Sequence, residues 1–126
     1  MALAKCTLPW KTAFIRAMMG NWIVCMSILM ATGSSSLASK MVAIFFPISA
    51  FVMLGLEHSI ANLFLVPLGM MRGGKVSAVD FLMKNLLPVT LGNIVGGAVC
   101  VGLSYSCIHG SLLDRFNKSV SPSLGK

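Results

Sequence analysis

Glu57, the single glutamate of the chain, lies next to His58 in the middle of the apolar stretch LGLEHSIANLF. Asn62 follows His58 by four residues, so a helical turn would place both side chains on one face. Imidazole exchanges protons near neutral pH, and ionisable residues at membrane depth are functional candidates by default. The plainer alternative is a neutral histidine hydrogen-bonded between helices. The adjacent acid and an expected helix break favour the functional interpretation.

Composition sets the environment of these residues. Of the 126 residues, 56% are hydrophobic and only 10% are charged, and the mean hydropathy is +0.87, which is too apolar for an ordinary soluble domain. The net charge of +7 comes from basic residues in separated clusters between apolar runs. This pattern is typical of loops and helix ends at a lipid headgroup surface. It lacks the aromatic-interleaved basic stripe that indicates nucleic-acid binding.

Three apolar runs predict an all-α, multi-pass integral membrane protein. The expected spans cover about residues 13–33, 41–71 and 86–109, within one membrane domain over 1–110, and a polar tail follows over 111–126. A cleaved signal peptide is an alternative for the first run. Asn21 and Trp22 interrupt that run, and its lead-in is long, so a retained span is favoured.

The second run is too long for one straight span. It extends over about 31 residues, whereas roughly 20 suffice to cross the hydrocarbon core. Its polar residues lie near its middle, so we expect a broken helix with the break near EHSIAN, between the permissive positions Gly55 and Pro67. Helix N-termini at such a break carry partial positive charge and could hold an anion.

Other chemistry finds no support in the sequence. The four cysteines have no zinc-ligand or CxxC spacing, and apolar packing explains them better. We find no nucleophile motif, carboxylate pair or phosphate-binding glycine loop. The sequence therefore predicts neither an enzyme nor a cofactor or metal site.

Two longer stretches carry a family resemblance. FFPISAFVMLGLEHSIANLFLVPLGM and NLLPVTLGNIVGGAVCVGLSY resemble the formate/nitrite transporter family, and KCTLPWKTAFIRAMMGNWIVC is similar to its fourth transmembrane helix. The resemblance covers about residues 5–105 and corresponds to helices four to six, the C-terminal half of the fold. It implies half of an aquaporin-like inverted-repeat bundle. It also implies a homo-pentamer in the lipid bilayer if the first half of the fold completes each pore.

The resemblance also implies roles for individual residues. His58 matches the central pore histidine of the family, Asn62 a polar residue near it, and Lys5 a vestibule lysine that attracts anions. Phe51 and Val24 match residues of the apolar constrictions.

Two further residues are expected to have structural roles near the pore. A lone buried carboxylate is costly, so we expect Glu57 to accept hydrogen bonds from loop amides or to pair with a basic group. Asn93 lies within the Gly92 to Gly96 GxxxG spacing, which lets helices approach closely. We expect Asn93 to hydrogen-bond across that contact.

The implied function is transport of small monovalent weak-acid anions: formate, nitrite, lactate or hydrosulfide. A bare anion crosses an apolar constriction with difficulty, so passage as the neutral acid, with a proton from bulk or relayed near His58, is expected. The plasma membrane is the expected location. The alternative is a truncated, transport-inactive membrane protein that packs with full-length family members or modulates them.

Overall fold

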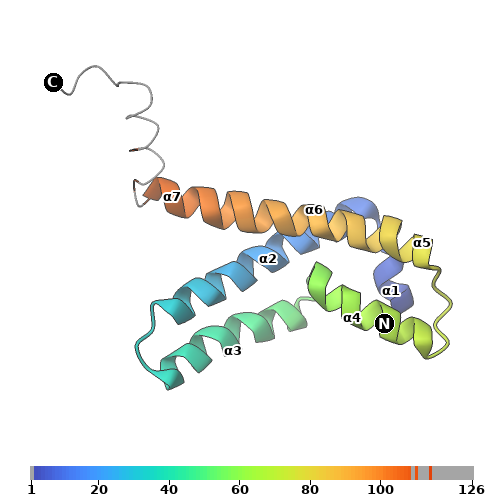
Figure 1. The fold of residues 1–126 in the computed structure, drawn as a ribbon, viewed down its shortest axis with the longest axis horizontal. Coiled ribbons are helices and arrows are strands. Elements are labelled where there is room, and N and C mark those ends of the chain that lie inside the picture. Colours follow the sequence, from blue (N-terminus) through green and yellow to red (C-terminus); the bar gives the residue numbers. More distant parts are fainter. Residues whose placement is uncertain (1, 109, 111–113, 115–126) are drawn as a thin grey trace, which may run out of the picture.

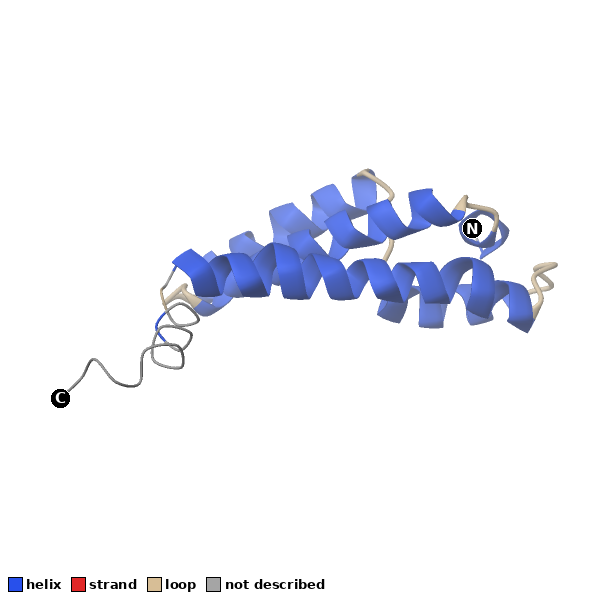
Figure 2. Cartoon of the chain, turned by 90° about the horizontal axis from the view of Figure 1, so that it is seen from above, coloured by secondary structure: helices blue, strands red, loops and turns tan. Residues whose placement is uncertain are grey.

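The computed structural model describes residues 2–108, 110 and 114, and within these residues the regular structure is entirely helical. Short loops join the helices, and the last helical segments stack end to end into one long rod (Figures 1 and 2). The elements, in chain order, are α1 (Ala2–Cys6), α2 (Trp10–Thr32), α3 (Leu37–Met53), α4 (Ser59–Met71), α5 (Ala78–Asp80), η1 (Phe81–Leu86), α6 (Leu87–Val95), η2 (Gly96–Leu103) and α7 (Ser104–Ile108).

Two helices of the described chain are long and apolar enough to cross a membrane. They are α2, with 23 residues, and the continuous rod Ala78–Ile108, with 31 residues. The helices α3 and α4 have 17 and 13 residues. At about 1.5 Å per residue, each is shorter than a hydrocarbon core of about 30 Å. Non-helical backbone over residues 54–58 separates them.

The loop expected between the first two spans is shorter than its sequence indicates. Part of the stretch between the predicted spans 13–33 and 41–71 is helical, because α3 begins at Leu37 rather than near residue 41. The Ser36 hydroxyl accepts a hydrogen bond from the Ser39 amide at 3.1 Å and caps this end of the helix. A serine cap satisfies one of the amides that a helix start leaves without a partner.

The last helix also begins earlier than expected, at Ala78 rather than near residue 86. Ser77 caps it, and an exposed ion pair joins Asp80 to Lys84 at 2.7 Å one turn later. The charged residues Asp80 and Lys84, which favoured a loop in the sequence, therefore lie on a helix. The end of the predicted span at residue 109 lies outside the described residues, as does the predicted tail over 111–126 apart from Asp114.

A widened π-helical stretch, η1, precedes Pro88. Proline has no N–H, so the carbonyl four residues before it loses its α-helical partner. Just before the proline, the Leu87 amide bonds to the carbonyl of Leu82, five residues earlier, whereas an α-helix would use the carbonyl four residues earlier. This widening occurs where Asn85 is fully buried against the rest of the chain, which fits the tendency of π-bulges to lie at functional sites.

The helices α2 and α6 run in the same direction and pack through glycines (Figure 1). A methyl group added to Gly92 would lie 2.8 Å from the Cβ of Ala17, and one added to Gly96 would collide with the carbonyl oxygen of Met18. Only a residue without a side chain permits this approach. The small residue Ala17 and the neighbouring Val89 are fully buried in the same contact.

We predict that Gly96→Ala destabilises the chain by about 1–3 kcal/mol, because its methyl group would overpack a backbone contact. Gly102→Ala is the matched control in the same helix. The nearest atom to its added methyl is the Gly97 carbonyl oxygen at 3.4 Å, and alanine is the better helix former. Thermal unfolding in detergent, followed by circular dichroism, measures both variants. Equal melting temperatures for the two would contradict the close packing of α2 on α6.

Candidate functional site

The non-helical loop between α3 and α4 is held against α2. Gly55 has a φ of +62°, a backbone conformation that glycine adopts without strain. The Leu56 amide returns to the Phe51 carbonyl at 3.2 Å. A methyl group on Gly20 of α2 would lie 2.8 Å from the carbonyl oxygen of Glu57. The loop backbone therefore touches α2 where a side chain is absent, and this places Glu57 inside the bundle.

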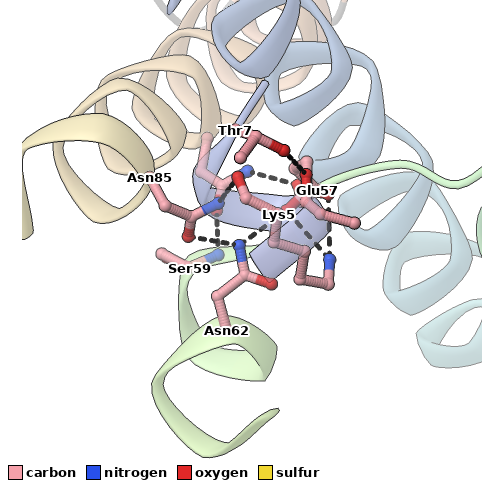
Figure 3. Close-up of polar contacts among 8 residues, drawn as sticks. Lys5, Thr7, Glu57, Ser59, Asn62 and Asn85 are labelled. Carbon is pink, nitrogen blue, oxygen red and sulfur yellow. Dashed lines mark hydrogen bonds and ion pairs between the residues drawn. The ribbon is translucent and has the colours of Figure 1, made fainter. Parts of the chain in front are cut away.

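The carboxylate of Glu57 is paired with Lys5. The Lys5 ammonium lies 2.9 Å from both carboxylate oxygens, and the two side chains are 17% and 4% exposed. Asn62 also donates from Nδ2 to the Glu57 Oε2 atom at 2.6 Å (Figure 3). This buried acid thus has the basic partner and the hydrogen bond that its burial requires.

Two asparagines extend this network to the last helix. Asn62 Nδ2 donates to Asn85 Oδ1 at 2.8 Å, and Asn85 Nδ2 donates to the Lys5 carbonyl at 2.9 Å. Both asparagines are fully buried. The contacts join α1, α4 and η1 around Glu57 (Figure 3), which fixes several elements relative to one carboxylate. We call Lys5, Glu57, Asn62 and Asn85 the polar network.

Asn93 forms a second junction, on α6. Its Nδ2 donates to the Ala17 carbonyl at 2.8 Å and to the Glu57 carbonyl at 3.2 Å. Its Oδ1 accepts from the Ser59 amide at 2.8 Å, and its own carbonyl accepts from Asn21 at 2.7 Å. One side chain therefore ties α2, the loop and the first turn of α4 together.

The His58 side chain takes part in none of these hydrogen bonds. It is half-buried and directly precedes α4 without capping it through its side chain. Its ring meets the Phe51 ring edge to face, with centroids 6.3 Å apart and planes at 76°. Within the described part of the chain the imidazole has no hydrogen-bond partner, so both of its nitrogens remain available to a ligand or a proton.

One cavity of about 370 Å³ brings most of the predicted site residues together. Its wall includes five of them: Lys5, Phe51, Glu57, His58 and Asn62. Val24 and Asn93 are not in that wall. Val24 is half-buried on α2, and its carbonyl accepts a hydrogen bond from the Ser27 hydroxyl.

Sequence reasoning missed three polar residues of this region. Arg16 is exposed and lines the cavity, Asn85 belongs to the polar network, and Asn21 bonds to the Asn93 backbone. An available signal was the cost of placing an amide inside an apolar helix, which requires a partner. No group of three or more potential metal ligands occurs in the part of the chain that the structure describes.

We predict that Lys5→Met destabilises the chain by about 3–5 kcal/mol, because it leaves the Glu57 carboxylate buried without its partner. Adding Glu57→Gln should restore much of that loss. The matched control is Lys84→Met, which removes an exposed pair with 63% and 43% exposed side chains and should cost at most about 0.5 kcal/mol. Chemical unfolding in detergent measures all three. Equal effects at Lys5 and Lys84 would refute the buried pair.

The sequence is similar to several transporters. The family model described as formate/nitrite transporter matches residues 1–107. "Probable formate transporter" of Methanothermobacter thermautotrophicus is 50% identical over 99 residues, covering 79% of this chain and 36% of that protein. Formate-nitrite transporter 2 of Toxoplasma gondii is 39% identical over 98 residues, covering 78% and 21%. Formate channel FocA of Escherichia coli is 33% identical over 109 residues, covering 72% and 38%.

The fold is also similar to a solved structure described as a pentameric formate channel with formate bound. The TM-score is 0.76 at 35% sequence identity, and the match covers 86% of this chain and 49% of that one. The chain thus spans about half of the solved channel and a smaller share of the curated relatives. The matched relatives are transporters and channels rather than enzymes, and two membrane-length helices agree with a membrane protein. The chain belongs to the formate/nitrite transporter family.

Proposed function

We propose that the cavity beside His58 is one wall of a path by which small weak-acid anions cross the membrane. Formate, nitrite, lactate and hydrosulfide are the candidate substrates, and a first half of the same fold would supply the opposite wall. One observation carries this proposal: His58, Asn62, Lys5 and Phe51 lie on three helices and a loop, yet meet at one cavity. The named relatives include formate transporters and a formate channel.

In this proposal α3 and α4 together form the second of three membrane crossings. The non-helical backbone between them suits that arrangement, because irregular backbone at membrane depth is tolerated where it is buried in protein or lines a cavity. The N-terminus of α4 reaches the cavity wall at His58 and Ala61. Its partial positive charge would favour an anion there. The membrane domain would then cover residues 1–110, and the plasma membrane is its proposed location.

The charges around the cavity refine the proposed role of Lys5. Its ammonium is already paired with Glu57, so the pair adds little net charge to the cavity. Arg16 also lines the wall and is exposed, and the two ion pairs of the described chain, Lys5–Glu57 and Asp80–Lys84, do not include it. We propose that Arg16 supplies most of the attraction for an incoming anion, and that Lys5 acts at shorter range.

Passage past the apolar side chains would favour the neutral acid. A carboxylate loses its hydration at Phe51, whereas its conjugate acid carries no charge. We propose that His58, packed against Phe51 and without a hydrogen bond to other described residues, relays the proton. Val24 would contribute to an apolar constriction elsewhere along the path, and Glu57 and Asn93 would keep the wall in place.

A second candidate function rests on the uncovered face of α3. No α3 residue is buried, and Phe45 and Phe46 are each 65% exposed. Such a face suits packing against lipid or further membrane helices, including those of a homo-pentamer. A transport-inactive chain that packs with full-length family members would use the same surface.

We predict that proteoliposomes containing this chain together with a first half of the same fold take up formate faster as the external pH falls, by up to about tenfold per pH unit, because each anion must take up one proton and His58 delivers it. His58→Asn should flatten this dependence. The matched control is His109→Asn, at the other histidine of the chain. A stopped-flow assay with an internal pH dye measures uptake.

Two outcomes would count against these proposals. Unchanged pH dependence in His58→Asn would remove the relay role. No uptake by a correctly folded chain supplied with a first half of the fold, together with altered uptake when the chain is mixed with a full-length family member, would favour the transport-inactive function instead.

A further inference from the structure

The amide of Asn62 is held in one orientation. Its Nδ2 donates to Glu57 Oε2 at 2.6 Å and to Asn85 Oδ1 at 2.8 Å. Rotating the amide by 180° would place its oxygen against these two acceptors. Asn85 cannot turn to accommodate the change, because its own Nδ2 is bonded to the Lys5 carbonyl. The oxygen of Asn62 is therefore fixed as a hydrogen-bond acceptor.

That oxygen has no donor. Asn62 is fully buried, and its Oδ1 accepts no hydrogen bond from the described residues. A buried acceptor without a donor costs about 1–3 kcal/mol, so native proteins rarely retain one without a reason. Asn62 forms part of the cavity wall. In Figure 3 its oxygen points away from Asn85, toward the side of Lys5. The missing donor would thus come from the cavity.

A hydrogen-bond donor lines the same cavity as this acceptor. A lysine ammonium carries three N–H groups, and two distances of 2.9 Å account for the contacts of Lys5 with Glu57. The side chain of Lys5 is 17% exposed and also lines the cavity. One N–H therefore remains for a ligand. Lys5 and Asn62 together present one donor and one acceptor to whatever occupies this end of the cavity.

We propose that Lys5 and Asn62 form a specificity site for the protonated form of a small weak acid. The acid carbonyl would accept from Lys5, and the acid hydroxyl would donate to Asn62 Oδ1. A bare carboxylate or nitrite has only acceptor atoms, so its oxygens would face the Asn62 oxygen with no proton between them. This inference rests on the proposed function, and it assigns discrimination between acid and anion to Asn62.

A series of three small ligands tests the site on the unaltered chain in lipid nanodiscs. Formamide has a carbonyl and an N–H donor, methyl formate has a carbonyl but no N–H or O–H donor, and formate has only acceptors. Saturation-transfer NMR at neutral pH gives their relative affinities. We expect formamide to bind about tenfold more tightly than methyl formate, the worth of one buried hydrogen bond. Equal affinities for formamide and methyl formate would overturn the proposal, because they would mean that water alone satisfies the Asn62 oxygen. Tighter binding of formate than of formamide would also overturn it.

Variants connect that preference to the residue. Asn62→Leu should abolish the preference for formamide over methyl formate. Asn21→Leu is the matched control, because Asn21 is also an amide on a packed helix but does not line the cavity. Retention of the full preference in folded Asn62→Leu would also overturn the site. If that variant does not fold, the ligand series on the unaltered chain still decides the question.

The test separates this inference from the proposed function. Formamide preference without formate uptake would retain the site and reject transport by this chain. Acid-stimulated uptake without formamide preference would retain transport and reject the role of Asn62.

Discussion

The ion pair between Glu57 and Lys5 is the interaction on which the arrangement of this chain depends. A carboxylate that is 4% exposed is tolerated only with a close opposite charge and further hydrogen bonds. Both are present, and each comes from a different element: the ammonium from α1, and one amide from α4. Burial of one charge thus requires α1, the loop and α4 to meet. That meeting brings Lys5, Glu57 and Asn62 to the wall of one cavity.

Close backbone packing allows the same loop to reach the interior. Gly20 lets the Glu57 carbonyl contact α2, and Gly92 and Gly96 let α6 contact α2. Asn93, between these last two glycines, then binds both α2 and the loop. Glycines remove side chains so that backbones approach, and the buried amides satisfy the polar groups that this approach exposes. These contacts leave two ionisable side chains of the cavity wall, His58 and Arg16, without a fixed side-chain partner in the described chain.

Much of the site could be predicted because its residues are chemically conspicuous. One glutamate and one histidine inside an apolar run indicate a functional position, and the cost of burying a carboxylate predicts a structural pairing for Glu57. The identity of the partner was not predictable, because Lys5 is 52 residues away in the sequence. The family resemblance had given Lys5 a different role, the attraction of anions. Asn85 was missed because it follows Lys84 and precedes the span predicted to begin near residue 86, so it was assigned to a loop. The helix starts at Leu37 and Ala78 were missed because serine caps and an ion pair resemble loop composition.

The central claim is that Glu57 is ionised and paired inside the bundle, and it can be measured directly. Glu57 is the only glutamate of the chain, so labelling glutamate with ¹³C marks this one carboxyl group. Infrared difference spectroscopy of the labelled chain in lipid at neutral pH should show carboxylate bands whose frequencies shift in Lys5→Met, because this variant removes the ammonium that contacts both carboxylate oxygens. A protonated carboxyl group in the unaltered chain, or carboxylate bands that Lys5→Met leaves unchanged, would contradict the account.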